Sequence, residues 1–227
     1  MKKYELTEET VIVSGKTLYR IRAVRDFGSV KAGDLGGYIE KEENLSHCGE
    51  AWVSDNAMVC GYAEVCGYAE VSDDAVVSGD AVVSGNARVC GEAWVCDNAE
   101  VCCYAEVCDN AKVCCYAEVC DNAEVYGNAK VSGNAKVSGK ACVCGDAEVS
   151  DTRHFFVQGP IGSRDGFVTF YRTKNNTVGV RCGCFSGSLQ EFVDRVEETH
   201  GGSRYEKEYK LAAELAKVCI RLEGESR

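Results

Sequence analysis

The sequence predicts a mainly β protein in which residues 51–150 form a parallel β-helix, preceded by a β cap and followed by a small α+β domain. Three observations support this prediction. Alanine recurs at every sixth position from Ala51 to Ala147, and a valine stands two residues after each alanine. Gly, Asp and Asn, which favour tight corners, are frequent at the last two positions of each unit. The six-residue period ends after Asp151, where the composition changes.

The period of six indicates a short strand followed by a tight corner. In the unit 81–86, Ala81 and Val83 point to the same side of the pleat and fill the interior, and the residue between them faces solvent. Gly or Asp in the fifth position tolerates left-handed backbone angles, so the chain can turn there. Seventeen such units follow one another without interruption.

The repeated A-x-V units, with Ser or Cys after the valine, are similar to those of the hexapeptide-repeat family. This resemblance implies a left-handed parallel β-helix with three strands per coil. The seventeen units would then form between five and six coils and a shaft about 25 to 30 Å long. The order of DLGGYI, the uninterrupted repeats, GPIGSR and GCFSGSLQEF also resembles that of uncharacterised proteins encoded by bacteriophages and prophages. That second resemblance implies no established reaction.

Residues 1–50 are predicted to cap the first coil and to form an irregular coil of their own, because the end of a solenoid exposes unpaired strand edges. Strand-like runs at 10–13 and 17–21 supply this cap, and residues 34–39 lead into the repeats.

Residues 151–227 are predicted to cap the other end and to form a separate β-β-β-α-α module. Ser188 and Glu191 make a capping box that opens the first helix, and a glycine pair at 201–202 closes it. The strands are expected at 154–157, 166–172 and 177–182, and the second helix from about Arg204 to Leu222.

Charge and composition restrict the partners of the protein. Residues 1–150 carry 13 Lys and Arg against 25 Asp and Glu, whereas residues 151–227 carry 12 against 11. Such an acidic shaft repels phosphate backbones and anionic lipids, so neither nucleic acid nor membrane is expected as a partner. Because the sequence shows no membrane span or signal peptide, we expect a cytoplasmic protein in a bacterial host, with its 16 cysteines reduced.

Several cysteines are expected to stack from coil to coil, as in the pairs 90/108, 96/114 and 102/120. Thiolates hold zinc and copper, which makes a metal site one interpretation. However, the repeats contain no C-x-x-C pair and no histidine, and serine occupies the same position in other repeats. Cysteine is therefore expected to replace serine in packing, and neither a metal nor another cofactor is predicted. The same applies to Cys182 and Cys184.

One outward column of the shaft begins with three apolar residues in successive coils, Met58, Val76 and Trp94. Contiguous apolar patches on a soluble protein often mark contacts, so these residues are predicted to lie in an interface of a homo-oligomer or between domains. The alternative is that the surface tolerates them.

Two glycine-rich segments of the C-terminal module, 159–164 and 182–188, suit the binding of an anion. The free N–H groups of a helix N-terminus attract anions, and arginine forks bind phosphate or carboxylate. We therefore expect a small anionic ligand, for which a nucleotide is a candidate. The alternative is that the glycines only make turns and the arginines lie in solvent. The predicted ligand-binding residues are Ser163, Arg164, Arg172, Arg181, Ser186 and Ser188.

The favoured function is a non-catalytic binding protein, and the resemblance to phage proteins suggests a sponge that sequesters a nucleotide immune signal. Many hexapeptide-repeat proteins are acyltransferases, so an enzyme of that kind is the first alternative. It would need a histidine base beside a cleft, yet the three histidines, His47, His154 and His200, lie outside the uninterrupted repeats. No catalytic residue is therefore predicted. The other alternative is a purely structural scaffold protein.

Overall fold

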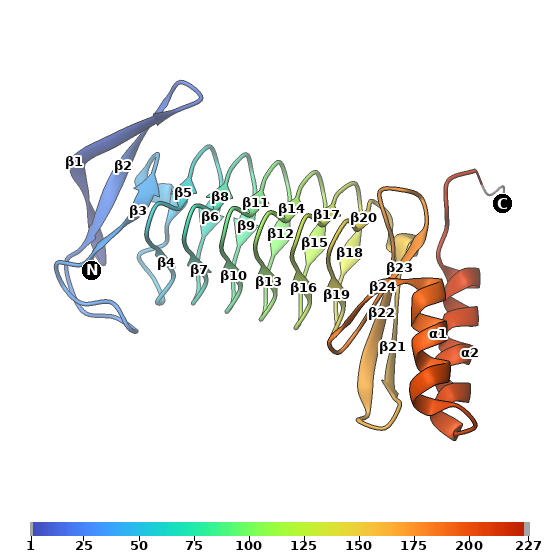
Figure 1. The fold of residues 1–227 in the computed structure, drawn as a ribbon. Coiled ribbons are helices and arrows are strands. Elements are labelled where there is room, and N and C mark those ends of the chain that lie inside the picture. The colour runs from blue at the N-terminus through green and yellow to red at the C-terminus, as the bar shows by residue number, and fades with distance from the viewer. Residues whose placement is uncertain (1, 225–227) are drawn as a thin grey trace.

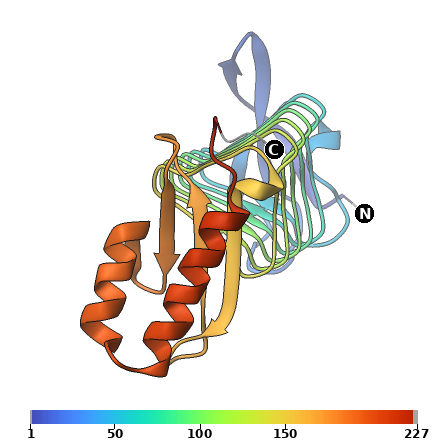
Figure 2. The ribbon, with the colours of Figure 1, turned by 90° about the vertical axis from the view of Figure 1, so that its right-hand side faces the viewer.

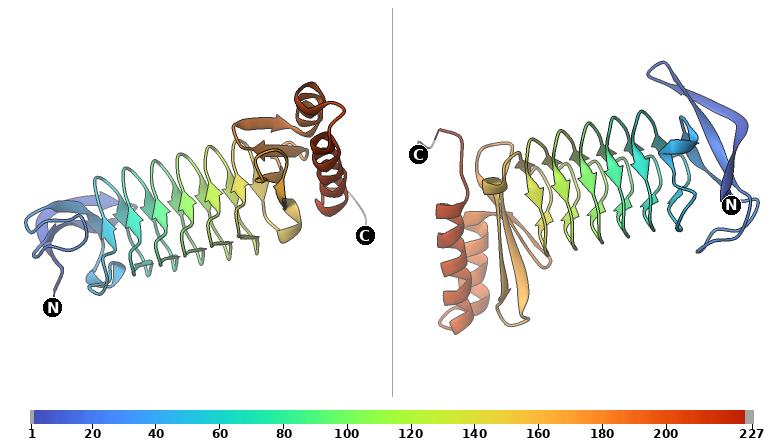
Figure 3. Two further views of the ribbon diagram at one scale, coloured as in Figure 1. Left: turned by 90° about the horizontal axis from the view of Figure 1, so that it is seen from below. Right: turned by 180° about the vertical axis from the view of Figure 1, so that it is seen from behind.

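The computed structural model describes residues 2–224 and shows an elongated molecule with three parts in a row (Figure 1). An N-terminal hairpin stands at one end, a β-solenoid of stacked coils forms the middle, and an α+β domain covers the other end (Figures 1 and 3). Within residues 2–224, no helix has the length and apolar character needed to cross a membrane.

The solenoid confirms the predicted repeat, because each of the units contributes one two-residue strand to one of three parallel sheets. Each strand except the last three pairs with the strand three units later, as Val95 does with Val113. The solenoid strands are β4 Trp52–Val53, β5 Met58–Val59, β6 Glu64–Val65, β7 Glu70–Val71, β8 Val76–Val77, β9 Val82–Val83, β10 Arg88–Val89, β11 Trp94–Val95, β12 Glu100–Val101, β13 Glu106–Val107, β14 Lys112–Val113, β15 Glu118–Val119, β16 Glu124–Val125, β17 Lys130–Val131, β18 Lys136–Val137, β19 Cys142–Val143 and β20 Glu148–Val149.

The interior of the solenoid is made of the repeat alanines and valines, as the period predicts. All of these residues from Ala51 to Val149 are buried and belong to one continuous core. Burying a valine side chain stabilises a fold by roughly 1.5 to 3 kcal/mol, so the repeated valine is the main apolar contribution of each unit.

The fifth residue of each unit turns the corner with a positive φ, except in the last unit, where Asp151 is extended with a φ of −146°. Glycine holds this position in many units, with φ between 62° and 76°. Aspartate takes it in others, and its carboxylate accepts a hydrogen bond from the backbone N–H of the corner one coil later. Asp109 accepts in this way from Gly127 at 3.0 Å, and Asp121 from Gly139 at 3.0 Å. The side chains of these aspartates therefore point toward the following coil.

The N-terminal part extends the first solenoid sheet. The strands β1 (Tyr4–Val13) and β2 (Lys16–Ala23) form a long antiparallel hairpin, and β3 (Leu35–Ile39) joins it to the solenoid by pairing in parallel with β5. A short helix, η1 (Glu42–Asn44), follows. The buried Tyr4 hydroxyl donates to carbonyl oxygens on both sides of η1, which fixes the hairpin to the first coil.

The C-terminal domain has one strand more than the three that the sequence predicts. The fourth strand, β24, covers the Gly- and Ser-rich residues 185–188, which lack the β-branched residues typical of strands but pair with β23 along their whole length. The elements are η2 Thr152–His154, β21 Phe155–Ile161, β22 Gly166–Arg172, β23 Val178–Cys182, β24 Phe185–Ser188, α1 Leu189–His200 and α2 Arg204–Cys219.

This four-stranded antiparallel sheet lies between the solenoid and the two helices (Figures 1 and 2). One face carries Val168 and Phe170 into a core with Phe192 of α1 and Ala213 of α2. The other face covers the last coils, where the backbone N–H of Cys142 donates to the Thr169 hydroxyl at 2.9 Å. The sheet therefore belongs to both the C-terminal domain and the end of the solenoid.

Candidate functional site

The six residues predicted to bind an anion do not converge on one site. Ser163 and Arg164 are exposed on the turn between β21 and β22, beyond the pair formed by Ile161 and Gly166. Ser188 lies at the other end of the sheet, because it pairs with Gly179, which also pairs with Tyr171. Tyr171 is the fifth residue after Gly166 along β22, which corresponds to roughly 16 Å.

The N-terminus of α1 already holds an anion from its own helix. Ser188 donates to the Glu191 carboxylate from its backbone N–H and from its hydroxyl, each at 2.8 Å. These bonds lower the pKa of Glu191, so the carboxylate is ionised at neutral pH. The predicted capping box is confirmed, and it takes the place that the sequence assigned to an external anion.

Arg172 is a structural residue at the junction between the solenoid and the C-terminal domain. Its side chain is buried, and its three guanidinium nitrogens donate to the Glu148 carbonyl at 3.1 Å, the Ser150 hydroxyl at 3.3 Å and the Glu223 carboxylate at 2.9 Å. A ligand would have to displace all three partners. Arg172 is therefore better described as a clamp than as part of an open site.

Arg181 and Ser186 are the one predicted pair that the structure brings together, because they are register partners on β23 and β24. The Arg181 guanidinium lies 5.7 Å from the centre of the Tyr126 ring. Ser186 is exposed, and its hydroxyl lies 3.9 Å from the Cys144 sulfur. Both residues thus lie beside the last coils of the solenoid, with Arg181 half-buried there and Ser186 exposed at the edge.

The side chains around Arg181 include a thiol with an unusual environment. The Cys144 sulfur is buried and lies 3.4 Å from the Tyr171 hydroxyl. Hydrogen bonds from Cys142 and then from Tyr171 hold the pKa of Cys144 well below its usual range, whereas the bond to Cys144 raises the pKa of Cys142. A thiolate at Cys144 would balance the charge of Arg181, which makes this arginine a poor anchor for an external anion.

A different pair of arginines lines an open hollow beside the end of the solenoid. Arg153, in η2, and Arg221, after α2, share this hollow of about 610 Å³ with Asp151 and Thr152. Within residues 2–224, neither guanidinium makes an ion pair or a side-chain hydrogen bond. The backbone N–H of Arg221 donates to the Arg153 carbonyl at 2.8 Å, which holds the two residues next to each other.

The carboxylate in this hollow is held in place as well. The backbone N–H of Arg153 donates to Asp151 at 2.8 Å, and this bond lowers the pKa of Asp151, with a further contribution from the charge of Arg221. The sequence reasoning missed Arg153 and Arg221 because 68 residues separate them and neither belongs to a motif. Only the excess of arginine in the non-acidic tail pointed to this region.

A second hollow, of about 440 Å³, lies at the other end of the molecule between the N-terminal part and the solenoid. Its lining includes the aromatic side chains of Phe27, Trp52 and Tyr68 and the carboxylates of Glu50 and Glu70. Two carboxylates repel an anion, so this hollow does not suit the predicted ligand.

Two of the three histidines are hydrogen-bonded to the backbone. His47 accepts from the N–H of Lys3 at 3.2 Å and stacks on Tyr4, and His154 accepts from the N–H of Ser150 at 3.1 Å. Packing and capping account for these two side chains.

The expectation that all cysteines are reduced is wrong for one stacked pair, because Cys90 and Cys108 form a disulfide between adjacent coils. Their Cα atoms lie 4.7 Å apart, the spacing of neighbouring strands, which is within the range that a disulfide spans. The remaining 14 cysteines are free.

No protein-family model matches this chain, and no curated protein sequence matches it either. The arginine-lined hollow at the junction is therefore selected on its geometry and charge alone.

Proposed function

We propose that this protein is a non-catalytic binding protein in which a rigid solenoid carries a C-terminal α+β domain, and that Arg153 and Arg221 bind a small anionic ligand at their junction. The observation that carries this proposal is the pair of arginines without ionic partners in the described residues, lining one hollow of about 610 Å³. That volume falls within the range typical of small-molecule sites.

The chemistry of the hollow favours an anion that also carries hydroxyl groups. Two guanidinium forks can each donate two hydrogen bonds to a phosphate or carboxylate. Asp151 stands beside them as an acceptor, and Thr152 offers a hydroxyl. A phosphate next to a sugar hydroxyl matches this combination, so we propose a nucleotide-like ligand.

The resemblance to hexapeptide-repeat proteins and to phage-encoded proteins extends this proposal. It supports a left-handed sense for the solenoid and a role as a cytoplasmic phage or prophage protein that sequesters a nucleotide immune signal. Sequestration requires tight binding without turnover, which agrees with a site made of arginines and one structurally held carboxylate.

Calorimetric titration with mononucleotides, cyclic nucleotides and ADP-ribose derivatives tests the proposal. Charge-assisted hydrogen bonds contribute about 1.5 to 3 kcal/mol each, so Arg153→Ala and Arg221→Ala should each weaken binding by roughly ten- to a hundredfold. Arg164→Ala removes an equal charge from the exposed turn about 16 Å along the sheet and is the matched control.

If binding weakens in Arg164→Ala but not in the other two variants, the site lies at the turn between β21 and β22, as the sequence suggested. If the parent protein binds none of these compounds, the proposal fails, and a structural role as a capped shaft becomes the better explanation.

A further inference from the structure

Vicinal cysteines occur twice on the shaft, and in both cases the two sulfur atoms lie on the same side of the chain. The sulfurs of Cys114 and Cys115 are 3.9 Å apart, and those of Cys102 and Cys103 are 3.8 Å apart. The second cysteine of each pair occupies the corner position with a positive φ, 66° at Cys115 and 65° at Cys103. This conformation turns the second sulfur toward the first.

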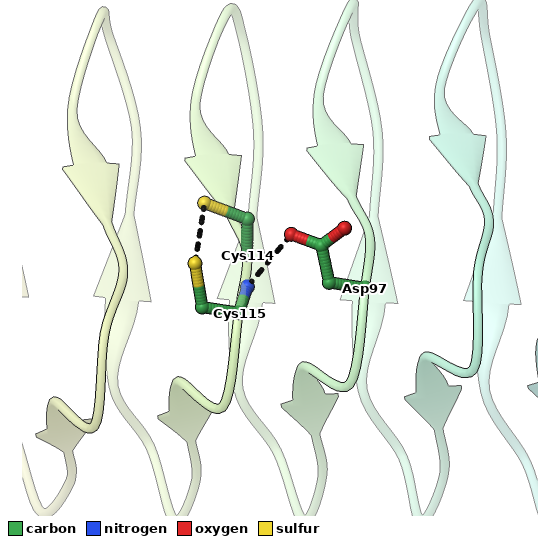
Figure 4. Close-up of side chains that lie close together, drawn as sticks. All are labelled: Asp97, Cys114 and Cys115. Atoms are coloured by element: carbon green, nitrogen blue, oxygen red, sulfur yellow. Dashed lines mark hydrogen bonds between the residues drawn. The ribbon is translucent and has the colours of Figure 1, made fainter.

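One of these pairs also has a carboxylate next to it (Figure 4). Asp97 occupies the corner one coil earlier, and its carboxylate accepts from the Cys115 N–H at 3.1 Å. One ligand atom each from Asp97, Cys114 and Cys115 lie within 4.8 Å of one another, the one such trio of His, Cys, Asp or Glu found in residues 2–224. The other carboxylate oxygen of Asp97 is left without a partner in this contact (Figure 4).

We propose that Asp97, Cys114 and Cys115 form a zinc site on one corner of the solenoid, bridging two adjacent coils. With Zn–S bonds of about 2.3 Å and tetrahedral angles, two thiolates on one zinc ion lie about 3.8 Å apart. The observed separation of 3.9 Å nearly equals this value. Cys96 stacks on Cys114 in the same column and can fill the fourth position, because Val95 pairs with Val113 just before them.

The direction of the corner aspartates explains why the other vicinal pair is not equivalent. These carboxylates point to the following coil, so Asp97 points to Cys115, whereas Asp121, one coil after Cys103, points away from it to Gly139. The corner one coil before Cys103 is Gly85, which has no side chain to offer. The pair 102/103 therefore has thiols but no carboxylate from a neighbouring corner.

Access and burial at the trio also suit a bound cation. Cys114 is buried, Cys115 is half-buried and Asp97 is exposed, so an ion can enter from solvent and still lose most of its water to the protein ligands. A zinc ion here would add a further link between two coils that are already joined by backbone hydrogen bonds, such as the one from Cys96 N to the Val113 carbonyl, and by the Cys90–Cys108 disulfide.

The test is a zinc titration of reduced protein against a competing chelator, with cobalt as a spectroscopic probe of tetrahedral thiolate coordination. Three single variants remove one ligand each: Asp97→Asn, Cys114→Ser and Cys115→Gly. All three replacements suit their positions, since Ser132 shares the column of Cys114 and Gly133 that of Cys115. Each should weaken zinc binding by about 100-fold or more, because outer-shell contacts alone are worth 10- to 100-fold.

The matched controls are Asp121→Asn, Cys102→Ser and Cys103→Gly, which make the same replacements at the pair without a carboxylate. They should leave zinc affinity within about twofold of the parent, well below the effect of losing a ligand. Cys115→Gly also removes the Cβ from a residue in the left-handed conformation, so without metal this variant should have a melting temperature no lower than that of the parent. A loss of zinc binding in this variant would therefore reflect the lost ligand and not unfolding. Absence of thiolate-coordinated cobalt in the parent, or equal loss in the control variants, would overturn the proposal.

Discussion

At the scale of single residues, the corner position shows how one backbone requirement is met by different side chains. Glycine adopts the left-handed conformation without strain, and aspartate adopts it while also bonding to the next coil, as Asp73 does to the Gly91 N–H at 2.9 Å. Cysteine at positions 103 and 115 gains no such bond from its own side chain to the next corner. The left-handed conformation costs a residue with a Cβ roughly 1 to 2 kcal/mol, so these cysteines are the strained corners.

This difference predicts how variants of Asp109 rank in stability. Asp109→Gly loses the hydrogen bond to Gly127, worth about 1 kcal/mol, but it also removes the Cβ from a left-handed corner, so the two effects should nearly cancel. Asp109→Ala loses the same bond and keeps the Cβ at a φ of 59°, so it should cost about 1 kcal/mol and be the less stable of the two variants. Urea denaturation of the two variants and the parent measures the order. Equal stabilities of the two variants would mean that the left-handed conformation carries no cost at this corner.

At the scale of elements, the short helix η2 connects the last coil to the C-terminal sheet and depends on a neutral histidine. His154 is buried, and its Nδ1 atom accepts from the Ser150 N–H at 3.1 Å. Burial lowers the pKa of His154 below 6.5, and the charge of Arg172 lowers it further. A protonated Nδ1 could no longer accept this hydrogen bond, so the junction requires the neutral ring.

Because the folded state disfavours protonation of His154, the unfolded chain binds more protons at pH values just below 6.5. This histidine therefore contributes stability above pH 6.5, and that contribution is lost as the pH falls toward the lowered pKa of the folded state. Melting temperatures measured across this range should fall less steeply in His154→Gln than in the parent. Parallel curves for the two proteins would show that His154 does not titrate differently on folding.

At the scale of the whole molecule, one face of the solenoid carries a continuous apolar column. Tyr38 pairs with Met58, Met58 with Val76, and Val76 with Trp94. Trp94 is 49% exposed, and the Lys112 ammonium lies 5.3 Å from the centre of its ring. The structure confirms the predicted column, and the proposed contact between subunits or domains through it remains a prediction.

If this column lies in a homo-oligomer interface, a charge in it should weaken association. Trp94→Glu should then lower the mass measured by sedimentation without unfolding the solenoid, since the side chain points outward. Val82→Glu is the control, because it places the same charge at the same strand position of another sheet. Equal masses and equal protease sensitivity for parent and Trp94→Glu would identify the column as tolerated surface.

The sequence by itself determined the solenoid, because the signal for it is local and repeated. In each unit, the alanine and the valine mark the inward positions and the fifth residue marks the turn. This pattern repeats from Ala51 to Val149. The capping box at Ser188 and Glu191 was predictable for the same reason, since both partners lie within four residues. The strand at 185–188 was not, because its Gly and Ser residues become a strand only when β23 pairs with them.

Only the tertiary structure decided which charged side chains meet in the C-terminal domain and at its junction with the solenoid. Glu191 and Glu223 occupy the places that the sequence assigned to a ligand at Ser188 and Arg172. The hollow at Arg153 and Arg221 joins two segments that are distant along the chain, whereas the neighbourhood of Asp97 and Cys115 follows from the 18-residue spacing of stacked coils. The physical reason is that charges and ligands pair with whatever folding brings within a few ångströms, and residue type alone does not specify those distances.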